Sequence, residues 1–227
     1  MTTQLDTELQ SLKAELISMW TLVISQLIKT HDALLAFDKS LANDVIANEK
    51  RVNALELKID RDCENIFALF NPVAIDLRFV LAVLKINNNL ERTGDIAEGI
   101  AQYLVHASKP FDKPLLSLTE IISMYEESTG MLQDVLNSFE NEDTALAKNT
   151  FIRDEVLDRI NFKANSVVAD YIRKNPDNAE ESLYILSAIR KLERVGDQCK
   201  NIAEEIVFYS EAKVMKHSGS KTPDEEL

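Results

Sequence analysis

Two carboxylates spaced four residues apart occur twice in this chain, each time within the same short pattern. The pattern Leu-Glu-Arg-x-Gly-Asp begins at position 90 and again at position 192, with threonine and then valine at the variable place. Side chains four residues apart lie on one face of a helix, about one turn from each other. The pairs Glu91/Asp95 and Glu193/Asp197 therefore place like charges side by side, and we expect a metal ion or an arginine to neutralise them.

A further acidic pair with the same spacing lies upstream of the second motif. This pair is Asp154 and Asp158, whereas Glu49 and Asn53 stand at the corresponding places of the first half. Pairs on two facing helices would surround a shared volume with oxygen ligands, as hard or borderline cations require. Asparagine offers only a neutral carbonyl oxygen. We therefore expect the stronger metal site in the second half, with iron, manganese, zinc or magnesium as the candidate ions.

A glycine precedes the aspartate of each motif, at Gly94 and Gly196. Glycine inside a helix costs up to about 1 kcal/mol relative to alanine. Because it recurs at the same register, we expect a neighbouring helix or a ligand to approach closely there.

The acidic pairs also admit a purely structural interpretation. An exposed acidic stripe paired with Arg92, Arg194 or Lys191 would need no metal. Ferritin-like di-iron proteins carry Glu-x-x-His on two helices, and none of the three histidines has a glutamate three residues before it. Neither a glycine-rich phosphate loop nor a Gly-x-Ser-x-Gly motif occurs. We therefore predict that the protein is not an enzyme.

Long helices must position these residues. Apolar residues recur at three- and four-residue intervals, as in Leu12, Leu16, Met19 and Val23, and no stretch alternates with a period of two. The predicted helices cover 5–36, 39–70, 72–108, 115–140, 143–174 and 176–212.

Capping residues support these helix starts. Aspartates can cap two helices, asparagine-proline pairs can open two more, and a Ser-x-x-Glu capping box can begin another. These are Asp38, Asp143, Asn71-Pro72, Asn175-Pro176 and Ser117/Glu120.

The two motifs are 102 residues apart, which indicates an internal duplication. Long helices without a strict heptad favour antiparallel bundles with short connections. We predict an all-α fold of two pseudo-symmetric three-helix bundles, 1–110 and 111–215. The tail 216–227 has no apolar face, and we expect it to be disordered.

Composition limits the classes of partner. The 227 residues carry a formal net charge of −13, which disfavours nucleic acid and anionic membranes. Two cysteines, Cys63 and Cys199, are too few for a disulfide scaffold. The longest weakly polar stretch, between Glu15 and Lys29, is too short to span a bilayer. We expect a cytoplasmic protein without direct membrane insertion.

Taken together, the motifs resemble the PhoU family of bacterial phosphate-uptake regulators. Besides the duplicated motif, the resemblance includes Pro-Val-Ala-Ile-Asp-Leu-Arg at 72–78 and Asn-Ile-Ala-Glu at 201–204, and it covers about 10–210. It implies a cytoplasmic, commonly dimeric protein that damps the phosphate-starvation response. Such proteins couple a phosphate transporter to a sensor histidine kinase. The resemblance also implies metal ligation by Glu91, Asp95, Asp154, Asp158, Glu193 and Asp197, with Glu49 and Asn53 as a weaker pair.

Alternatives to this function remain open at the level of sequence. They are an accessory regulator of an ion-coupled phosphate permease, a metal-dependent phosphoesterase, and a purely structural helical module. Asp76 and Arg78 admit two interpretations as well. Asp76 suits the positive end of a helix dipole, and Arg78 is a candidate partner contact.

Overall fold

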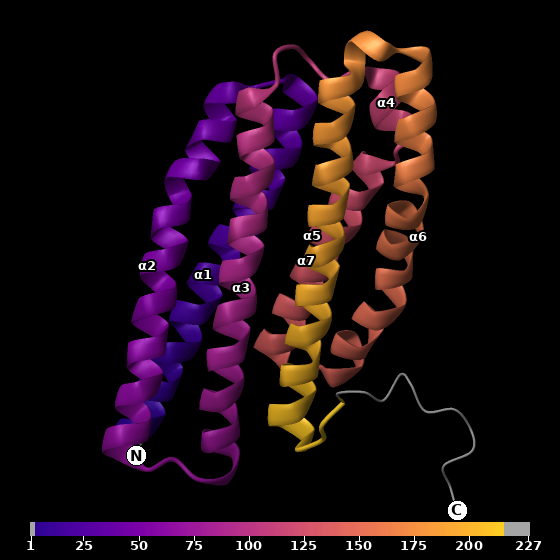
Figure 1. Cartoon of the computed structure of the whole chain (residues 1–227). Helices are drawn as coiled ribbons and strands as arrows, with labels where there is room; N and C mark the ends of the chain where they lie inside the picture. The colour runs from indigo at the N-terminus through magenta and orange to yellow at the C-terminus, as the bar shows by residue number, and fades with distance from the viewer. Residues whose placement is uncertain (1–2, 216–227) are drawn as a thin grey trace, which may run out of the picture.

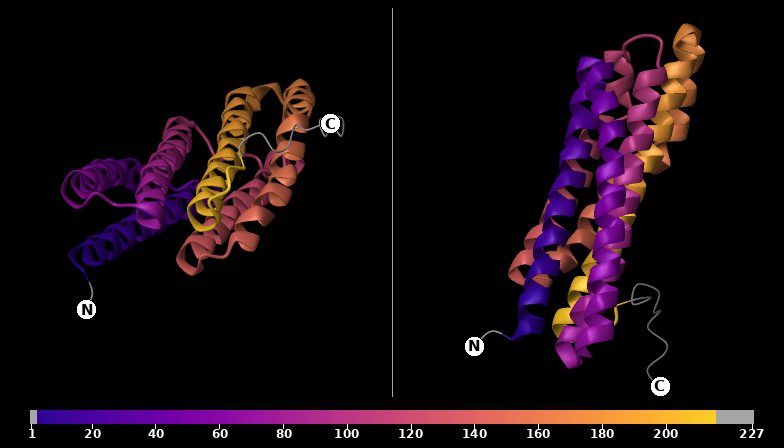
Figure 2. Two further views of the ribbon diagram at one scale, coloured as in Figure 1. Left: turned by 90° about the horizontal axis from the view of Figure 1, so that it is seen from below. Right: turned by 90° about the vertical axis from the view of Figure 1, so that its left-hand side faces the viewer.

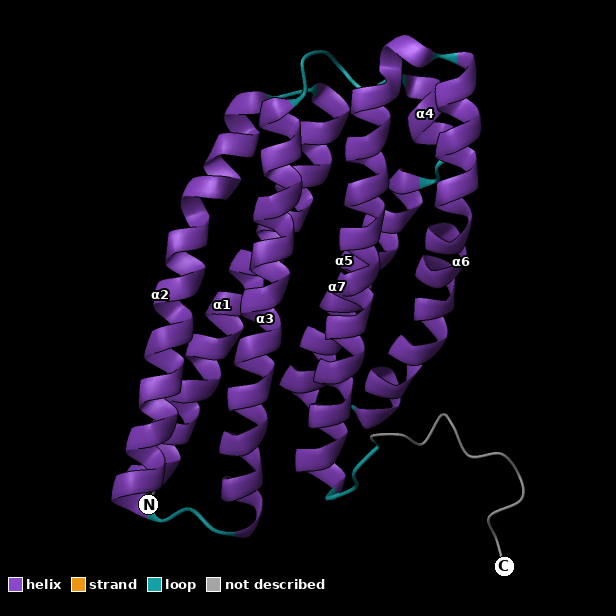
Figure 3. Ribbon diagram, in the orientation of Figure 1, coloured by secondary structure: helices purple, strands orange, loops and turns teal. Residues whose placement is uncertain are grey.

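The structure, a computed structural model, describes residues 3–215. Within this part of the chain the secondary structure consists of helices joined by loops, without strands (Figure 3). The predicted tail 216–227 lies outside the described residues. The helices are α1 (Gln4–Ala36), α2 (Lys39–Phe70), α3 (Ala74–His106), α4 (Lys113–Leu118), α5 (Ile121–Asn141), α6 (Thr144–Lys174), η1 (Pro176–Asn178) and α7 (Ala179–Glu211).

Six long helices form two three-helix bundles that stand side by side, which confirms the predicted all-α fold. Helices α1, α2 and α3 make one bundle, and α5, α6 and α7 make the other (Figures 1 and 2). The bundles meet where α3 packs along α7 and where α1 packs against α5. The duplicated motifs thus lie on α3 and α7, one of the two pairs of helices through which the halves pack together.

The hydrophobic core continues from one bundle into the other. Trp20 of α1 is fully buried, and its indole N–H donates to the carbonyl oxygen of Leu132 in α5 at 3.1 Å. Its ring lies 5.7 Å from that of Phe139. An aromatic side chain of this size contributes a large apolar area to the contact, and its polar atom is satisfied.

Helix α1 is long and apolar enough to cross a membrane by length and composition, with a window of mean hydropathy 1.2. This differs from the expectation drawn from the stretch between Glu15 and Lys29. Core helices of soluble proteins meet the same criterion, and 44% of the window is buried inside the structure here. Its buried residues, Leu16, Met19, Val23 and Leu27 among them, pack in the bundle core.

Two of the predicted helix starts are confirmed. The Asp38 carboxylate accepts from the backbone N–H groups of Ser40 and Leu41, and Asp143 repeats this arrangement at the start of α6. Each aspartate satisfies two of the N–H groups that a helix start leaves without an internal partner.

The two asparagine-proline predictions are wrong in their details. Asn71 ends α2 in the left-handed conformation, at φ 48°, and α3 begins only at Ala74. Asparagine tolerates this conformation well, so it serves as a C-cap rather than an N-cap. Asn175-Pro176 opens the short helix η1, and α7 follows from Ala179.

The predicted helix 115–140 is divided in two. Helix α4 ends at Leu118, and Glu120 adopts φ 54° immediately before α5. The Ser117/Glu120 capping box does not form, because Ser117 lies inside α4 and the Glu120 carboxylate pairs with Arg159 of α6 at 3.1 Å. A contact with another helix thus replaces the local one.

Candidate functional site

In the first half, α2 and α3 approach each other closely at the motif glycine. A methyl group at Gly94 would lie 3.0 Å from Oε2 of Glu49 and 3.2 Å from Cγ1 of Val52. The prediction of a close approach is therefore confirmed, and the approaching group is a carboxylate of the neighbouring helix.

The second half repeats this arrangement between α6 and α7. A methyl group at Gly196 would lie 2.5 Å from Oδ1 of Asp154 and 2.6 Å from Cδ1 of Leu157. Asp154 and Leu157 follow Glu49 and Val52 by 105 residues each. The duplication therefore extends to the side chains that contact the glycine.

Glu49 is a buried carboxylate without a cationic partner among the described residues. It is 4% exposed, its Oε1 has no hydrogen-bond partner, and its Oε2 accepts from Gln26 at 3.4 Å. Burial raises the pKa of Glu49 to about 7, and the charges of Asp95, Glu98 and Glu91 contribute to the rise. The first half thus holds concentrated negative charge that no lysine or arginine of the described chain pairs with.

Other carboxylates of the first half experience the same environment. Burial, followed by the charge of Asp95, raises the pKa of Glu91. Burial and the neighbouring Asp60 raise the pKa of Glu56 on α2. Each of these shifts reflects a charged form that is disfavoured, which a bound cation would reverse.

In the second half, a lysine pairs with two of the predicted carboxylates. Lys200 of α7 forms ion pairs with the buried Asp154 and, at 2.8 Å, with Asp197. Burial lowers the pKa of Lys200, but its contacts with Asp154 and Asp197 outweigh burial and raise it overall. Burial raises the pKa of Glu193, and the charges of Asp197, Asp158 and Asp154 add to the rise.

The cationic residues proposed for the structural alternative do not pair with the motif carboxylates in the described chain. Arg92, Arg194 and Lys191 instead line a hollow of about 330 Å³ between α3 and α7. Lys191 lies over Gly99, with its Nζ 5.9 Å from the centre of the Tyr103 ring. Sequence reasoning missed Lys200, although its position three residues after Asp197 was a readable signal for an ion pair on one helix face.

The residues present fit a cation in their chemistry but are not preassembled around one. Among residues 3–215, no three Asp, Glu, His or Cys side chains are grouped closely enough to hold a metal ion. Glu91 is half-buried and Asp95 is exposed, whereas the side chain of Glu49 is buried beneath them. Binding would therefore require the motif carboxylates to rotate toward the buried one. Asn53 is exposed on α2.

Asp76 and Arg78 lie near the start of α3, and both are half-buried. Nε of Arg78 donates to the carbonyl oxygen of Tyr209, close to the end of α7, at 3.3 Å. A cation at the C-terminal end of a helix is favourable with the helix dipole. Arg78 therefore has a structural contact between the two halves.

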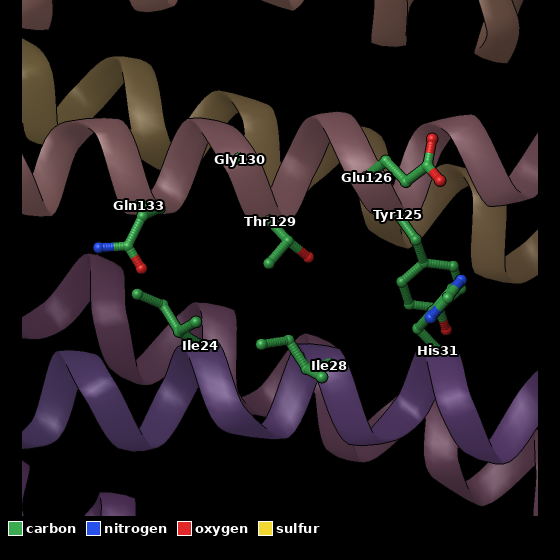
Figure 4. Close-up of a pocket in the computed structure, with 8 residues that line it drawn as sticks. All are labelled: Ile24, Ile28, His31, Tyr125, Glu126, Thr129, Gly130 and Gln133. Carbon is green, nitrogen blue, oxygen red and sulfur yellow. The ribbon is translucent and has the colours of Figure 1, made fainter.

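A second hollow, between α1 and α5, contains none of the motif residues. Figure 4 shows Ile24 and Ile28 of α1 facing Thr129 and Gln133 of α5 across a space of about 380 Å³. At one end the rings of His31 and Tyr125 meet edge to face, 5.3 Å apart. Its lining is mainly apolar and offers no cluster of carboxylates.

Comparison with known proteins agrees with the duplication. A family model described as "PhoU domain" matches residues 16–104 and again 121–206. The chain is 31% identical over 223 residues to the phosphate-specific transport system accessory protein PhoU homolog 1 of Thermotoga maritima, covering 96% of each chain. It is also 31% identical to the accessory protein PhoU of Escherichia coli, covering 99% of this chain and 92% of that one.

The fold is shared with a solved structure. The crystal structure of PhoU from Pseudomonas aeruginosa superposes with a TM-score of 0.85 at 29% identity. The match covers 92% of this chain and all of the other. The arrangement of two three-helix bundles therefore agrees with an experimental structure of a similar protein.

Proposed function

Because the chain belongs to the PhoU family, whose members are accessory proteins of phosphate-specific transport, we propose that it regulates phosphate uptake and the phosphate-starvation response. It would do so as a cytoplasmic, non-enzymatic adaptor between a phosphate transporter and a sensor histidine kinase. The observation that carries this proposal is the family match to both halves, which includes both copies of the acidic motif.

The acidic faces of the two halves support a metal-binding role within this function. The carboxylates that would hold an ion come from α2 and α3 in one half and from α6 and α7 in the other. They are Glu49, Glu91, Asp95, Asp154, Asp158, Glu193 and Asp197. A bound cation would supply positive charge where the buried carboxylates need it, and it would fix the relative position of the two helices that carry them.

A homodimer is part of the same proposal. Light scattering on the purified full chain is its measurement, with a mass of twice 25.7 kDa as the expected result. A mass of 25.7 kDa over the tested concentration range would contradict it.

The regulatory role is tested by deleting the gene and measuring phosphate uptake together with a reporter of starvation-induced transcription in phosphate-rich medium. We expect the reporter to be active without the gene and silent again when the wild-type chain is restored. An unchanged reporter and unchanged uptake in the deletion strain would refute the proposal. If only uptake through an ion-coupled permease changes, the alternative transporter would be the partner.

The contribution of the acidic motif is tested in the same strain with Glu91→Gln/Asp95→Asn and Glu193→Gln/Asp197→Asn. Glu155→Gln, on the exposed face of α6, is a control that removes one charge away from the motif. We expect the motif variants to restore less repression than the control. Equal restoration by all three would show that regulation does not depend on these carboxylates.

A further inference from the structure

Three cations gather in the seam between α3 and α7 without a carboxylate partner. Arg92 of α3 and Arg194 of α7 line the hollow of about 330 Å³ there, together with Lys191 of α7. None of the three forms an ion pair within residues 3–215. We propose that this hollow binds an oxyanion that keeps a proton at neutral pH, and that this anion is inorganic phosphate. The choice of phosphate rests on the proposed regulatory function, whereas the anion site itself rests on the side chains.

The duplication places both arginines at this seam. Each is the third residue of a copy of the acidic motif, and the two are 102 residues apart. Helices α3 and α7 pack side by side where the bundles meet, so that both copies border the same seam (Figure 1). A guanidinium group donates two parallel N–H groups to the oxygens of a phosphate. Two such groups that reach one hollow from different helices can therefore hold a tetrahedral anion between them.

The lysine of the hollow is held in place by its neighbours on α3. A methyl group at Gly99 would lie 2.5 Å from Nζ and 2.9 Å from Cε of Lys191, so the absence of a side chain makes room for the ammonium. Nζ also lies 5.9 Å from the centre of the Tyr103 ring, within the range of a cation–π interaction. The ammonium thus stays at the hollow although no carboxylate pairs with it.

The equivalent positions farther along the seam differ from this arrangement. Asn89 stands where the second half has Lys191, and Asn201 stands where the first half has Gly99, each at a distance of 102 residues. Nδ2 of Asn201 donates to Oδ1 of Asn89 at 3.3 Å, so two neutral side chains satisfy each other there. The nearby Lys85 pairs with Glu205 at 3.0 Å. The cation of that part of the seam is therefore compensated, whereas Arg92, Arg194 and Lys191 are not.

Two carboxylates in the same hollow limit which anions fit it. Asp95 and Glu98 lie beside the three cations, and Glu98 also accepts from Nε2 of Gln102 at 3.2 Å. An ionised carboxylate only accepts hydrogen bonds. It repels an anion that has no proton, and it accepts from an anion that has one. Phosphate retains at least one proton at neutral pH and sulfate retains none, so this mixed lining favours phosphate over sulfate.

The test is isothermal titration calorimetry of inorganic phosphate into the full-length chain, treated with chelator so that no metal ion mediates binding. Because the chain carries a net charge of −13, we expect little phosphate to bind elsewhere. Arg92→Gln and Arg194→Gln each remove one guanidinium group. Arg190→Gln is the matched control, since Arg190 is exposed on α7 and its side chain contacts Asn165. We expect each motif variant to weaken binding at least tenfold and the control to remain within twofold of wild type.

Gly99→Ala gives a second readout that leaves both arginines in place. Its methyl group would displace the Lys191 ammonium, so we expect phosphate to bind at least threefold more weakly. Thermal melting should show this variant to be at least as stable as wild type, which separates loss of the site from loss of the fold.

Sulfate tests the role of the carboxylates. We expect wild-type chain to bind sulfate at least tenfold more weakly than phosphate. Asp95→Asn/Glu98→Gln should reduce this preference at least threefold, because neutral side chains no longer repel an anion without a proton. Circular dichroism confirms that the variant is folded.

Three results would overturn the inference. They are no phosphate binding by folded, metal-free wild-type chain, binding unaffected by either motif arginine variant, and sulfate bound as tightly as phosphate. The deletion experiment measures regulation in cells and does not depend on this titration. An active reporter in the deletion strain together with no phosphate binding would refute this inference alone. An unchanged reporter and unchanged uptake would refute the regulatory function whatever the calorimetry shows.

Discussion

Replacing the motif glycines by alanine tests the packing on which the duplicated site depends. The structure predicts unequal effects, although the two glycines occupy the same place in their motifs. The new methyl group at Gly196 would meet Asp154 at 2.5 Å and Leu157 at 2.6 Å. At Gly94 the nearest atoms are 3.0 to 3.2 Å away. The second half is therefore the more tightly packed.

The neighbours of Gly196 cannot easily move. Asp154 is short, buried and held by Lys200, and Leu157 is fully buried. Overpacking of a well-packed interior costs about 1–3 kcal/mol, and the higher helix propensity of alanine returns up to about 1 kcal/mol. We therefore expect Gly196→Ala to lower the free energy of unfolding by up to about 2 kcal/mol.

Gly94→Ala should be close to neutral. Glu49 is one methylene longer than aspartate and has no cation to hold its carboxylate, so a displacement of a few tenths of an ångström suffices. The clash and the gain in helix propensity then offset each other.

Gly99→Ala supplies a control on the same helix as Gly94. Its methyl group would meet only the end of the flexible Lys191 side chain, at 2.5 Å from Nζ, and the lysine can swing aside. We expect this variant to be up to about 1 kcal/mol more stable than wild type.

Urea unfolding at neutral pH, followed by circular dichroism, measures all three variants. The expected order of stability is Gly99→Ala, then Gly94→Ala, then Gly196→Ala. A Gly196→Ala protein as stable as Gly99→Ala would refute the reasoning. It would mean that α6 and α7 are not held together at this glycine.

Three further outcomes are expected. In metal-free protein, Glu49→Gln should raise the free energy of unfolding by up to about 3 kcal/mol at pH 8 and change it little near pH 4. Urea unfolding at both pH values measures this difference. The reason is that a carboxylate whose folded-state pKa is raised from 4.5 to about 7 stabilises the fold while protonated, and this contribution is lost as pH rises through that range. An equal gain at both pH values would contradict burial of the charge. Glu142→Gly should stabilise the chain by about 0.5–1 kcal/mol in the same assay, because Glu142 ends α5 at φ 56° and glycine adopts this conformation without strain; a loss of stability would contradict it. Trp20→Phe should destabilise the chain by about 1–2 kcal/mol, because it leaves the Leu132 carbonyl oxygen without its indole donor; unchanged stability in urea would argue against this buried link.

Features governed by local contacts were predictable from the sequence of this protein. The three- and four-residue apolar spacing places the long helices, because a helix in a bundle must bury one face. Asp38 and Asp143 cap their helices through N–H groups two and three residues away, so no distant residue is involved. The duplication, and with it the two-bundle architecture, is visible because five of six motif residues recur.

Where several helices compete for one residue, the tertiary structure decided the outcome. Glu120 pairs with Arg159 on another helix instead of capping its own, and Asn71 ends one helix instead of starting the next. The cation that pairs with Asp154 and Asp197 is Lys200 rather than an arginine of the motif. Local spacing shows which side chains share a face of one helix. The packing of α2 against α3 and of α6 against α7 determines which charges meet across helices, and that packing leaves Glu49 buried without a cation and gives Asp154 a lysine.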